Sequence, residues 1–251
     1  MKVTVLGCGT SSGVPRMPEH WGACDPTNPK NTRRRVSVLV QKENTNILVD
    51  TSPDLRVQML DAKVGHMDAV FYTHDHADHT HGIDDLRGFF QTARKEVPVY
   101  GDAKTLSILK QRFGYIFQSK DGYPAICTAH EMLDTVTIGA IEVSSFTQGH
   151  GPNTTSLGYR FGDFAYSTDV NALDEAAFAA LAGVKVWVVD ALRYEPHPTH
   201  SHLAQTLEWI ARVKPDRAIL THMTNDMDYE TLKNALPKGV DPAFDGMEID
   251  V

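Results

Sequence analysis

The stretch FYTHDHADHTHG, from Phe71 to Gly82, decides the fold of this chain. It holds four histidines and two aspartates, and it begins at the end of an apolar run that reads as a buried strand. Alternate side chains of an extended chain point to the same side, so the imidazoles of His74 and His76 can reach one metal ion. Asp78 and His79 follow where a helix is expected to start, so they point elsewhere and suit a second ion. Imidazole nitrogen and carboxylate oxygen are typical ligands of zinc, manganese or iron(II).

Four other apolar runs end in the same kinds of side chain. They are NILVD, TQGH, AYSTD and AILTH, which end in Asp50, His150, Asp169 and His222. Taken alone, each of these residues is explained about equally well as an ordinary polar residue at the end of a strand or as a metal ligand. The joint arrangement is hard to explain in that way. The sequence therefore predicts a metal site assembled from the ends of several strands.

Length and composition indicate a globular protein. The chain has 251 residues, 41% of them hydrophobic and 22% charged, and we expect one domain over residues 1–251. The net charge of −8 argues against holding nucleic acid by bulk electrostatics. Three widely spaced cysteines form no CxxC pair, which favours reduced thiols in a cytoplasm. No apolar run approaches the 18 or so residues of a membrane-spanning helix, so no membrane association is expected.

Strand and helix patterns alternate along the chain. Strands are predicted at 3–7, 36–41, 45–50, 69–74 and 97–101, and helices at 52–63, 82–94 and 103–113. Two strands are predicted in each of the stretches 134–150 and 156–169, with further strands at 184–192 and 217–222 and helices at 174–182, 202–213 and 228–237. Residues 16–35 read as an irregular loop. The rough symmetry of the two halves predicts two sheets packed together with helices outside.

These motifs resemble the metallo-β-lactamase superfamily in its two-metal form, and the resemblance covers nearly the whole chain. It implies an αββα sandwich, in which two mixed sheets pack face to face under outer helices. It also implies two divalent ions, zinc or manganese, with the following ligands: His74, His76 and His150 at site one, Asp78, His79 and His222 at site two, and Asp169 between them. Asp50 would orient the histidine-rich loop, and we count Asp50 and Asp78 among the catalytic residues.

The chemistry follows from this ligand set. Two cations about 3.5–4 Å apart share a bridging water and lower its pKa, so that the resulting hydroxide attacks an electrophile. The same ions neutralise the charge that develops on the substrate oxygens. This predicts a dinuclear hydrolase that acts above all on anionic phosphodiesters.

A glycine loop, LGCGTSSGVP, extends from Leu6 to Pro15 after the first predicted strand. A similar loop opens the chain in ribonuclease Z and in the phosphodiesterase that accompanies carbon–phosphorus lyase. Its backbone N–H groups can bind a phosphate, and we expect Ser11 and Ser12 to contact the substrate. The alternative is a simple turn.

A second stretch, RYEPHPTHSHLAQTL from Arg193 to Leu207, contains three histidines before a predicted helix. His200 matches best the general acid of the carbon–phosphorus lyase phosphodiesterase, which protonates the leaving alkoxide. His202 is the alternative acid or a substrate contact, although it also reads as a residue near the helix cap. Arg193 and Ser156 are further candidate substrate contacts, which otherwise read as a solvated charge and the start of a strand.

The chain departs from that phosphodiesterase in one respect, although its tail, FDGMEI from Phe244 to Ile249, is similar. The relative carries an added structural zinc on a cluster of cysteines and a late histidine. Here only Cys24 remains, and Asn225 stands in place of the histidine, so we expect no structural zinc. The basic run KNTRRRVS, which contains Lys30, Arg33, Arg34 and Arg35, reads as a solvated surface, or alternatively as a phosphate grip for a nucleotide or RNA end.

We therefore expect a cytoplasmic phosphodiesterase that acts on small cyclic nucleotides or ribosyl phosphodiesters. The alternatives are a ribonuclease Z-like nuclease and a thioesterase or lactonase. RNA is the less favoured substrate because no long insertion is present to grip tRNA, and the histidine stretch disfavours the thioesterase. A non-enzymatic binding protein is disfavoured by the complete ligand set. A homodimer is possible.

Overall fold

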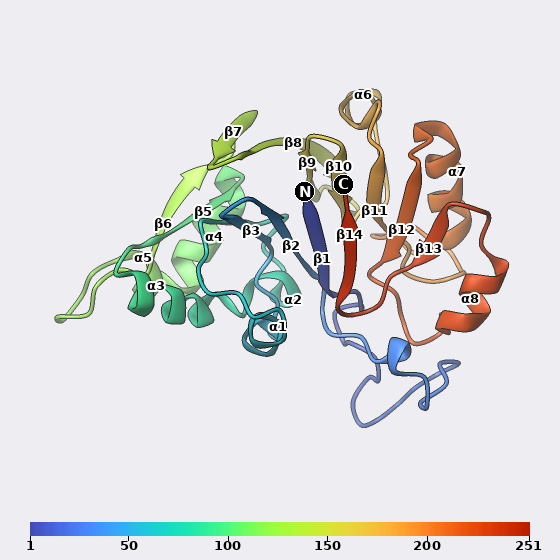
Figure 1. Cartoon of the computed structure of the whole chain (residues 1–251), viewed down its shortest axis with the longest axis horizontal. Coiled ribbons are helices and arrows are strands. Elements are labelled where there is room, and N and C mark those ends of the chain that lie inside the picture. Colours follow the sequence, from blue (N-terminus) through green and yellow to red (C-terminus); the bar gives the residue numbers. More distant parts are fainter.

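Two sheets of seven strands each form the centre of the computed structural model, which describes residues 1–251 (Figure 1). The first sheet has the strand order β14 (Met247–Asp250), β1 (Lys2–Gly7), β2 (Ser37–Lys42), β3 (Thr45–Val49), β4 (Ala69–Phe71), β5 (Val97–Gly101), β6 (Cys127–Glu131). The second has the order β13 (Val240–Pro242), β12 (Arg217–Thr221), β11 (Val186–Asp190), β10 (Phe164–Ser167), β9 (Thr155–Phe161), β8 (Ile141–Gly149), β7 (Thr135–Ile138).

Both sheets are mixed. Strands β1 to β3 pair antiparallel and β3 to β6 pair parallel, while β7 to β10 pair antiparallel and β10 to β13 pair parallel. The last strand, β14, returns to the first sheet and pairs antiparallel with β1, with Lys2 opposite Asp250. The two termini therefore lie side by side in Figure 1.

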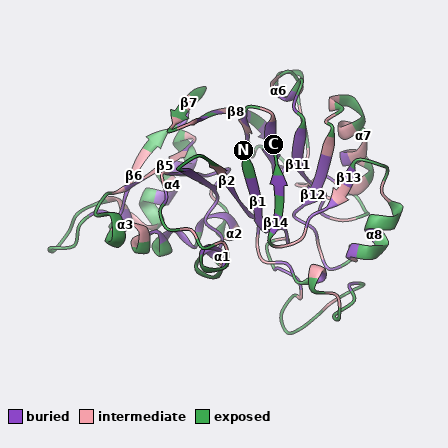
Figure 2. Ribbon diagram, in the orientation of Figure 1, coloured by how far each residue is buried: buried purple, intermediate pink, exposed green.

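The first sheet packs on both faces because successive side chains of a strand point in opposite directions. In β2, Val38 and Val40 join the large core cluster that also contains β9 to β12 residues of the second sheet. Leu39, between them, joins a separate cluster under the helices of the first half. The core strands are buried and the helices present their exposed side outward (Figure 2). This arrangement confirms the predicted αββα sandwich.

The helices are short and lie outside the sheets. They are α1 (Leu55–Asp61), α2 (Ala77–Thr80), α3 (Arg87–Ala93), α4 (Ala103–Arg112), α5 (Gly114–Phe117), α6 (Glu175–Leu181), α7 (Leu203–Val213) and α8 (Tyr229–Ala235), with the 3-10 helices η1 (Pro29–Asn31) and η2 (Ile83–Leu86). None of them has the length and apolar character needed to cross a bilayer.

The sequence-based elements differ from the structure in several places, of which three are instructive. The helix expected over 52–63 is shorter in the structure and covers only α1, Leu55–Asp61. The hydroxyl of Ser52 accepts a hydrogen bond from the backbone N–H of Asp54, which forms a turn before the helix begins. The helix expected over 82–94 is divided into η2 and α3. Strand β6 was not predicted, since its residues, Cys127 to Glu131, are mostly polar and partly exposed at the edge of the sheet.

Parallel pairing brings the ends of several strands to a common edge of each sheet. β3 and β4 end side by side in the first sheet, and β10, β11 and β12 do so in the second. The residues that end these strands or follow them within three positions include Asp50, His74, Asp169, Asp190 and His222. The fold therefore collects polar side chains from distant parts of the chain at one place.

Candidate metal centre

The predicted metal ligands converge at this edge. Three groups have ligand atoms within 4.8 Å of one another: His74, His76, His150 and Asp169; Asp78, His79 and His222; and Asp169, His200 and His222. All seven residues that the sequence assigned to metal binding are in these groups, together with His200. We refer to these eight side chains as the histidine–aspartate cluster.

Asp169 lies in the middle of the cluster, and its two carboxylate oxygens face different partners. Oδ1 lies 3.0 Å from Nε2 of His79 and 3.4 Å from Nε2 of His222. Oδ2 lies 3.7 Å from Nε2 of His74 and 3.5 Å from Nε2 of His150. One oxygen toward each group is the geometry that a bridging carboxylate requires.

Several buried nitrogen atoms of the cluster have no hydrogen-bond partner. They are the Nε2 atoms of His74 and His79 and both ring nitrogens of His222. An unpaired buried polar atom is costly, and one cation would satisfy the lone pair of His74 while a second would satisfy those of His79 and His222, with carboxylate oxygen from Asp169 and Asp78. The donor set of imidazoles and carboxylates therefore fits divalent cations such as zinc or manganese.

The other ring nitrogen of two histidines is held by the protein. Nδ1 of His79 lies 2.7 Å from Oδ2 of Asp50, and Nδ1 of His150 lies 2.8 Å from the backbone oxygen of Thr199. In the tautomer that donates from Nδ1, both rings direct their Nε2 lone pair into the cluster. Metal-binding histidines usually donate their second N–H in this way, which fixes the orientation of the ring.

Asp50 acts behind His79 rather than beside a substrate. Its side chain is fully buried, and it also accepts bonds from the backbone N–H and the hydroxyl of Thr73, at 2.8 and 2.9 Å. It therefore joins the end of β3 to the loop that starts at His74. The expectation that Asp50 orients this loop agrees with these contacts, whereas its inclusion among the catalytic residues does not, because no substrate can reach it.

Three residues of this region have a left-handed backbone. Asp50, Asp169 and His222 have φ angles of 63°, 53° and 58°. Such a conformation costs roughly 1–3 kcal/mol for a residue with a side chain, and it persists where surrounding structure imposes it. In each case it turns the side chain of a strand end toward the cluster.

The charges of the cluster are strongly coupled. Burial alone would raise the pKa of Asp169, but the imidazoles of His222, His79 and His74 hold it well below its usual range. Burial alone would lower the pKa of His222, but the nearby carboxylates of Asp169 and Asp78 raise it to about 9. The carboxylates thus create a strongly negative pocket that attracts positive charge, whether a proton or a metal cation.

Asp190 is a functional candidate that the sequence reasoning missed. This residue ends β11 and is fully buried, and its Oδ2 lies 2.8 Å from Nδ1 of His200. Nε2 of His200 lies 3.6 Å from Oδ2 of Asp169, and its ring stacks on that of His222 with centroids 4.7 Å apart. The run WVVD, like NILVD and AYSTD, is an apolar strand that ends in aspartate, and this signal would have identified Asp190.

The alternative general acid, His202, lies outside the cluster. It occupies the N-cap position of α7 and makes no side-chain hydrogen bond there. Of the two histidines, His200 is thus the one that the structure brings to the site.

Two of the predicted substrate contacts are engaged elsewhere. Ser156 is buried, and its hydroxyl donates to the backbone oxygen of Asp169 at 2.8 Å and accepts from Gln148. Its role is to support the Asp169 turn, so a substrate contact is ruled out by burial. The guanidinium of Arg193 donates to the backbone oxygens of Glu195 and Pro196 in its own loop. These donors are therefore already used and are not free to bind a phosphate.

The glycine loop lies beside the cluster. Gly9 pairs with Met223, the residue after His222, and the N–H of Thr10 donates to the backbone oxygen of Met223 at 3.2 Å. Ser11 and Ser12 are exposed at the tip of the loop, and their N–H groups make no bond within the protein. Their role as substrate contacts stays a prediction.

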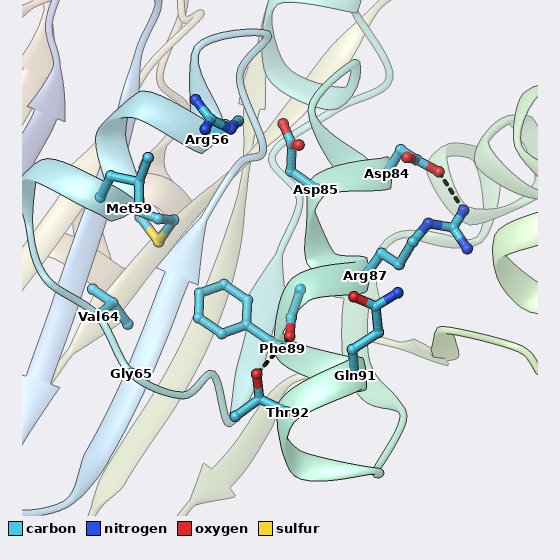
Figure 3. Close-up of a pocket in the computed structure, with 12 residues that line it drawn as sticks. Arg56, Met59, Val64, Gly65, Asp84, Asp85, Arg87, Phe89, Gln91 and Thr92 are labelled. Atoms are coloured by element: carbon cyan, nitrogen blue, oxygen red, sulfur yellow. Dashed lines mark hydrogen bonds and ion pairs between the residues drawn. The ribbon is translucent and has the colours of Figure 1, made fainter.

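A separate groove of about 430 Å³ lies between α1 and α3 (Figure 3). Its walls include Met59 and Phe89, with Arg56, Asp85 and Arg87 at the rim. None of its lining residues belongs to the histidine–aspartate cluster. The groove is therefore not part of the candidate metal centre.

The fold and the cluster define the metallo-β-lactamase class of hydrolases. The family model described as "Beta-lactamase superfamily domain" matches residues 45–223, so the chain belongs to this superfamily. This finding confirms the resemblance stated from the motifs.

More specific similarities extend over the whole chain. The structure described as "a New Diphosphatase from the PhnP Family" is 35% identical, with a TM-score of 0.92 over 100% of this chain and 97% of that one. An octanoyltransferase of Porphyromonas gingivalis (strain ATCC BAA-308 / W83) is 30% identical over 257 residues, which is 99% of this chain and 51% of the relative. The chain thus spans about half the length of that curated relative.

More distant structures share the fold alone. Zinc-bound PqqB from Methylobacterium extorquens is 17% identical, with a TM-score of 0.79 over 100% of both chains. The short form of human tRNase Z is 16% identical, with a TM-score of 0.73 over 100% of this chain and 99% of that one.

Proposed function

We propose that this hydrolase is a dinuclear phosphodiesterase that cleaves small phosphodiesters such as cyclic nucleotides or ribosyl phosphodiesters. The observation that carries the proposal is His200. It is placed beside Asp169 and held by the buried carboxylate of Asp190, as a proton donor to an alkoxide leaving group requires. Thioester and lactone hydrolysis have no comparable need for a donor at this place.

The cluster residues would hold two divalent ions, one on His74, His76 and His150 and the other on Asp78, His79 and His222, with Asp169 between them. When bound, such ions lower the pKa of a shared water and neutralise charge on the phosphoryl oxygens. Asp50 and Thr199 keep the rings of His79 and His150 oriented for this purpose. The identity of the metal, zinc or manganese, belongs to the proposal.

The protein's own groups would bind the substrate and move the proton. The free N–H groups of Ser11 and Ser12 lie in a loop that is bonded to Met223, next to His222, and they can donate to a phosphate oxygen. The imidazolium of His200 would give its Nε2 proton to the departing oxygen. Asp190 would stabilise that positive charge before the transfer, through the bond to Nδ1.

A second candidate is hydrolysis of a diphosphate bond. It is favoured by one finding, namely that the 35% identical relative is a diphosphatase. A diphosphate with organic groups on both ends is chemically close to a diester, because water again attacks a phosphorus that carries one negative charge. Its phosphate leaving group is much less basic than an alkoxide, so the need for His200 would be smaller.

The site and its surroundings also support narrower parts of the proposal. The net charge of −8 makes a small phosphodiester a better substrate than RNA. The three cysteines are free and buried, which agrees with a reducing compartment such as the cytoplasm. A homodimer, a single domain and the lack of a structural zinc stay predictions.

The test is hydrolysis of bis(p-nitrophenyl) phosphate by protein loaded with manganese or zinc, with Asp78→Ala as the control. We expect metal-dependent turnover that the variant lacks. Cyclic nucleotides and an organic diphosphate, ADP-ribose, are then compared by phosphorus NMR to separate the two candidates. Two bound ions without turnover of any of these compounds would overturn the proposal in favour of thioesters and lactones.

A further inference from the structure

We infer that Arg33 is a positioning residue for the second metal site, because its buried guanidinium holds the loop that follows His222. The inference rests on the proposed function, since it takes His222 to be a metal ligand. Arg33 lies 189 positions before His222 in the sequence and makes no contact with the cluster itself. Its effect would therefore pass through the backbone of residues 223–227, which we call the post-His222 loop.

Arg33 differs from its neighbours in the basic run. Its side chain is 2% exposed, whereas Arg34 and Arg35 are partly exposed and form ion pairs with Asp61 and Asp54. The prediction of a solvated surface is therefore wrong for Arg33. The alternative of a phosphate grip is also wrong for this residue, because no ligand can reach it.

The guanidinium of Arg33 is directed at the post-His222 loop. Nη1 donates to the backbone oxygen of Thr224 at 2.9 Å, and Nη2 donates to that of Met227 at 2.6 Å. No carboxylate forms an ion pair with Arg33, so backbone carbonyls are its principal partners. A buried cation requires such bonds, and bonds from a charged donor are stronger than those between neutral groups.

Asn31 completes this arrangement from the same segment. Its Oδ1 accepts from the N–H of Tyr229 at 2.8 Å, and its Nδ2 donates to Asp228 at 2.7 Å. Asn31 at the end of η1 and Arg33 two positions later thus hold both ends of the turn between β12 and α8.

The post-His222 loop connects the parts of the site. Thr224 donates its N–H to the backbone oxygen of Leu192, at the start of the loop that carries His200. Met223 donates to Cys8 and accepts from Thr10 in the glycine loop. Arg33 also exchanges backbone bonds with Val14, at the other end of the glycine loop. One residue therefore joins the glycine loop to the loop after His222.

The left-handed backbone of His222 depends on the loop that Arg33 holds. His222 has a φ of 58°, so it would leave this conformation if the following loop were free to relax. His74, His76 and His150 depend on other segments, namely the ends of β4 and β8. Loss of the Arg33 bonds should therefore weaken the site that contains His222 and spare the other.

The experiment measures metal binding to the full-length protein, with zinc set by a chelator buffer. The variants are Arg33→Met, Arg33→Lys and the matched control Arg34→Met. Wild type is expected to bind two ions in separable steps, and His222→Ala identifies the step that belongs to the second site. We expect Arg33→Met to weaken that step by about 10–100-fold, the usual effect of removing an outer hydrogen-bond partner, and to leave the other step and Arg34→Met unchanged.

Arg33→Lys keeps the charge but cannot reach both carbonyls, so it should weaken the same step to a smaller extent and tests the idea even if Arg33→Met fails to fold. At saturating zinc, kcat of the Arg33 variants should recover. Equal zinc affinities in Arg33→Lys and wild type would overturn the inference, and so would equal weakening of both steps. Failure of the proposed function gives a different result: wild type then binds fewer than two ions, or it binds two ions and does not hydrolyse phosphodiesters or diphosphates. The Arg33 inference is judged by the zinc affinities of the two steps alone.

Discussion

Replacement of His200 by alanine gives the sharpest test of the proposed chemistry. A positioned general acid contributes roughly 10²–10⁴-fold to the rate when the leaving group needs a proton. The alkoxide that leaves from a cyclic nucleotide needs one, whereas p-nitrophenolate is a weak base and does not. We expect His200→Ala to lower kcat/KM about 100-fold or more for a cyclic nucleotide and less than about tenfold for bis(p-nitrophenyl) phosphate.

Replacement of Asp190 tests the general-acid role of His200 indirectly. The bond of 2.8 Å from His200 to this buried carboxylate is charge-assisted, and such bonds contribute about 1.5–3 kcal/mol. Asp190→Asn keeps the shape and removes the charge, so a loss of about 10–100-fold is expected with the cyclic nucleotide only. His202→Ala is the matched control, and metal content is measured for every variant. Equal slowing of both substrates by His200→Ala would refute the general-acid role.

Three further predictions concern the ions and the stability of the fold. His222→Ala and Asp78→Ala should each lower the metal content from two ions to one per chain and abolish turnover; full activity in either would contradict a two-metal site. Asp50→Ala should weaken metal binding by about 10–100-fold, as measured by chelator competition, because the ring of His79 loses its acceptor. Burial raises the pKa of Asp245 from 3.8 to about 6, although the hydrogen bond from the backbone N–H of Arg34 lowers it in part. The folded protein therefore holds the proton of Asp245 more tightly than the unfolded chain does. This difference adds about 3 kcal/mol to the free energy of unfolding below pH 3.8, and the contribution is lost as the pH rises through about 6. The difference in unfolding free energy between wild type and Asp245→Asn should follow this course, and a constant difference from pH 3.5 to pH 7 would contradict it.

The metal centre could be predicted because its signals are local. His74, His76, Asp78 and His79 lie within six residues, and an apolar run that ends in a ligand residue is visible without knowledge of the fold. The αββα sandwich was predicted from the resemblance of these ligand motifs to the metallo-β-lactamase superfamily. The strands themselves were recognised where hydrophobic residues dominate, and β6 was missed because its composition is polar.

The rest could not be predicted because it depends on contacts between distant segments. Asp190 and His200 are ten positions apart, but they meet only through the path of the loop between β11 and α7. Arg33 is buried by residues about 190 positions later in the sequence, and a run of arginines gives no hint of which member will be covered. Ser156 faces Asp169 rather than solvent because of the pairing of β8 with β9.

The ligand set is divided between the two halves of the chain. His74, His76, Asp78 and His79 follow β4 in the first sheet, whereas His150, Asp169 and His222 follow β8, β10 and β12 in the second. During translation the earliest ligands leave the ribosome long before His222, which comes last among the ligands. A complete two-ion site can therefore form only on a chain that has been synthesised past His222 and whose two sheets have docked. Binding of the second ion thus reports that the two sheets have come together.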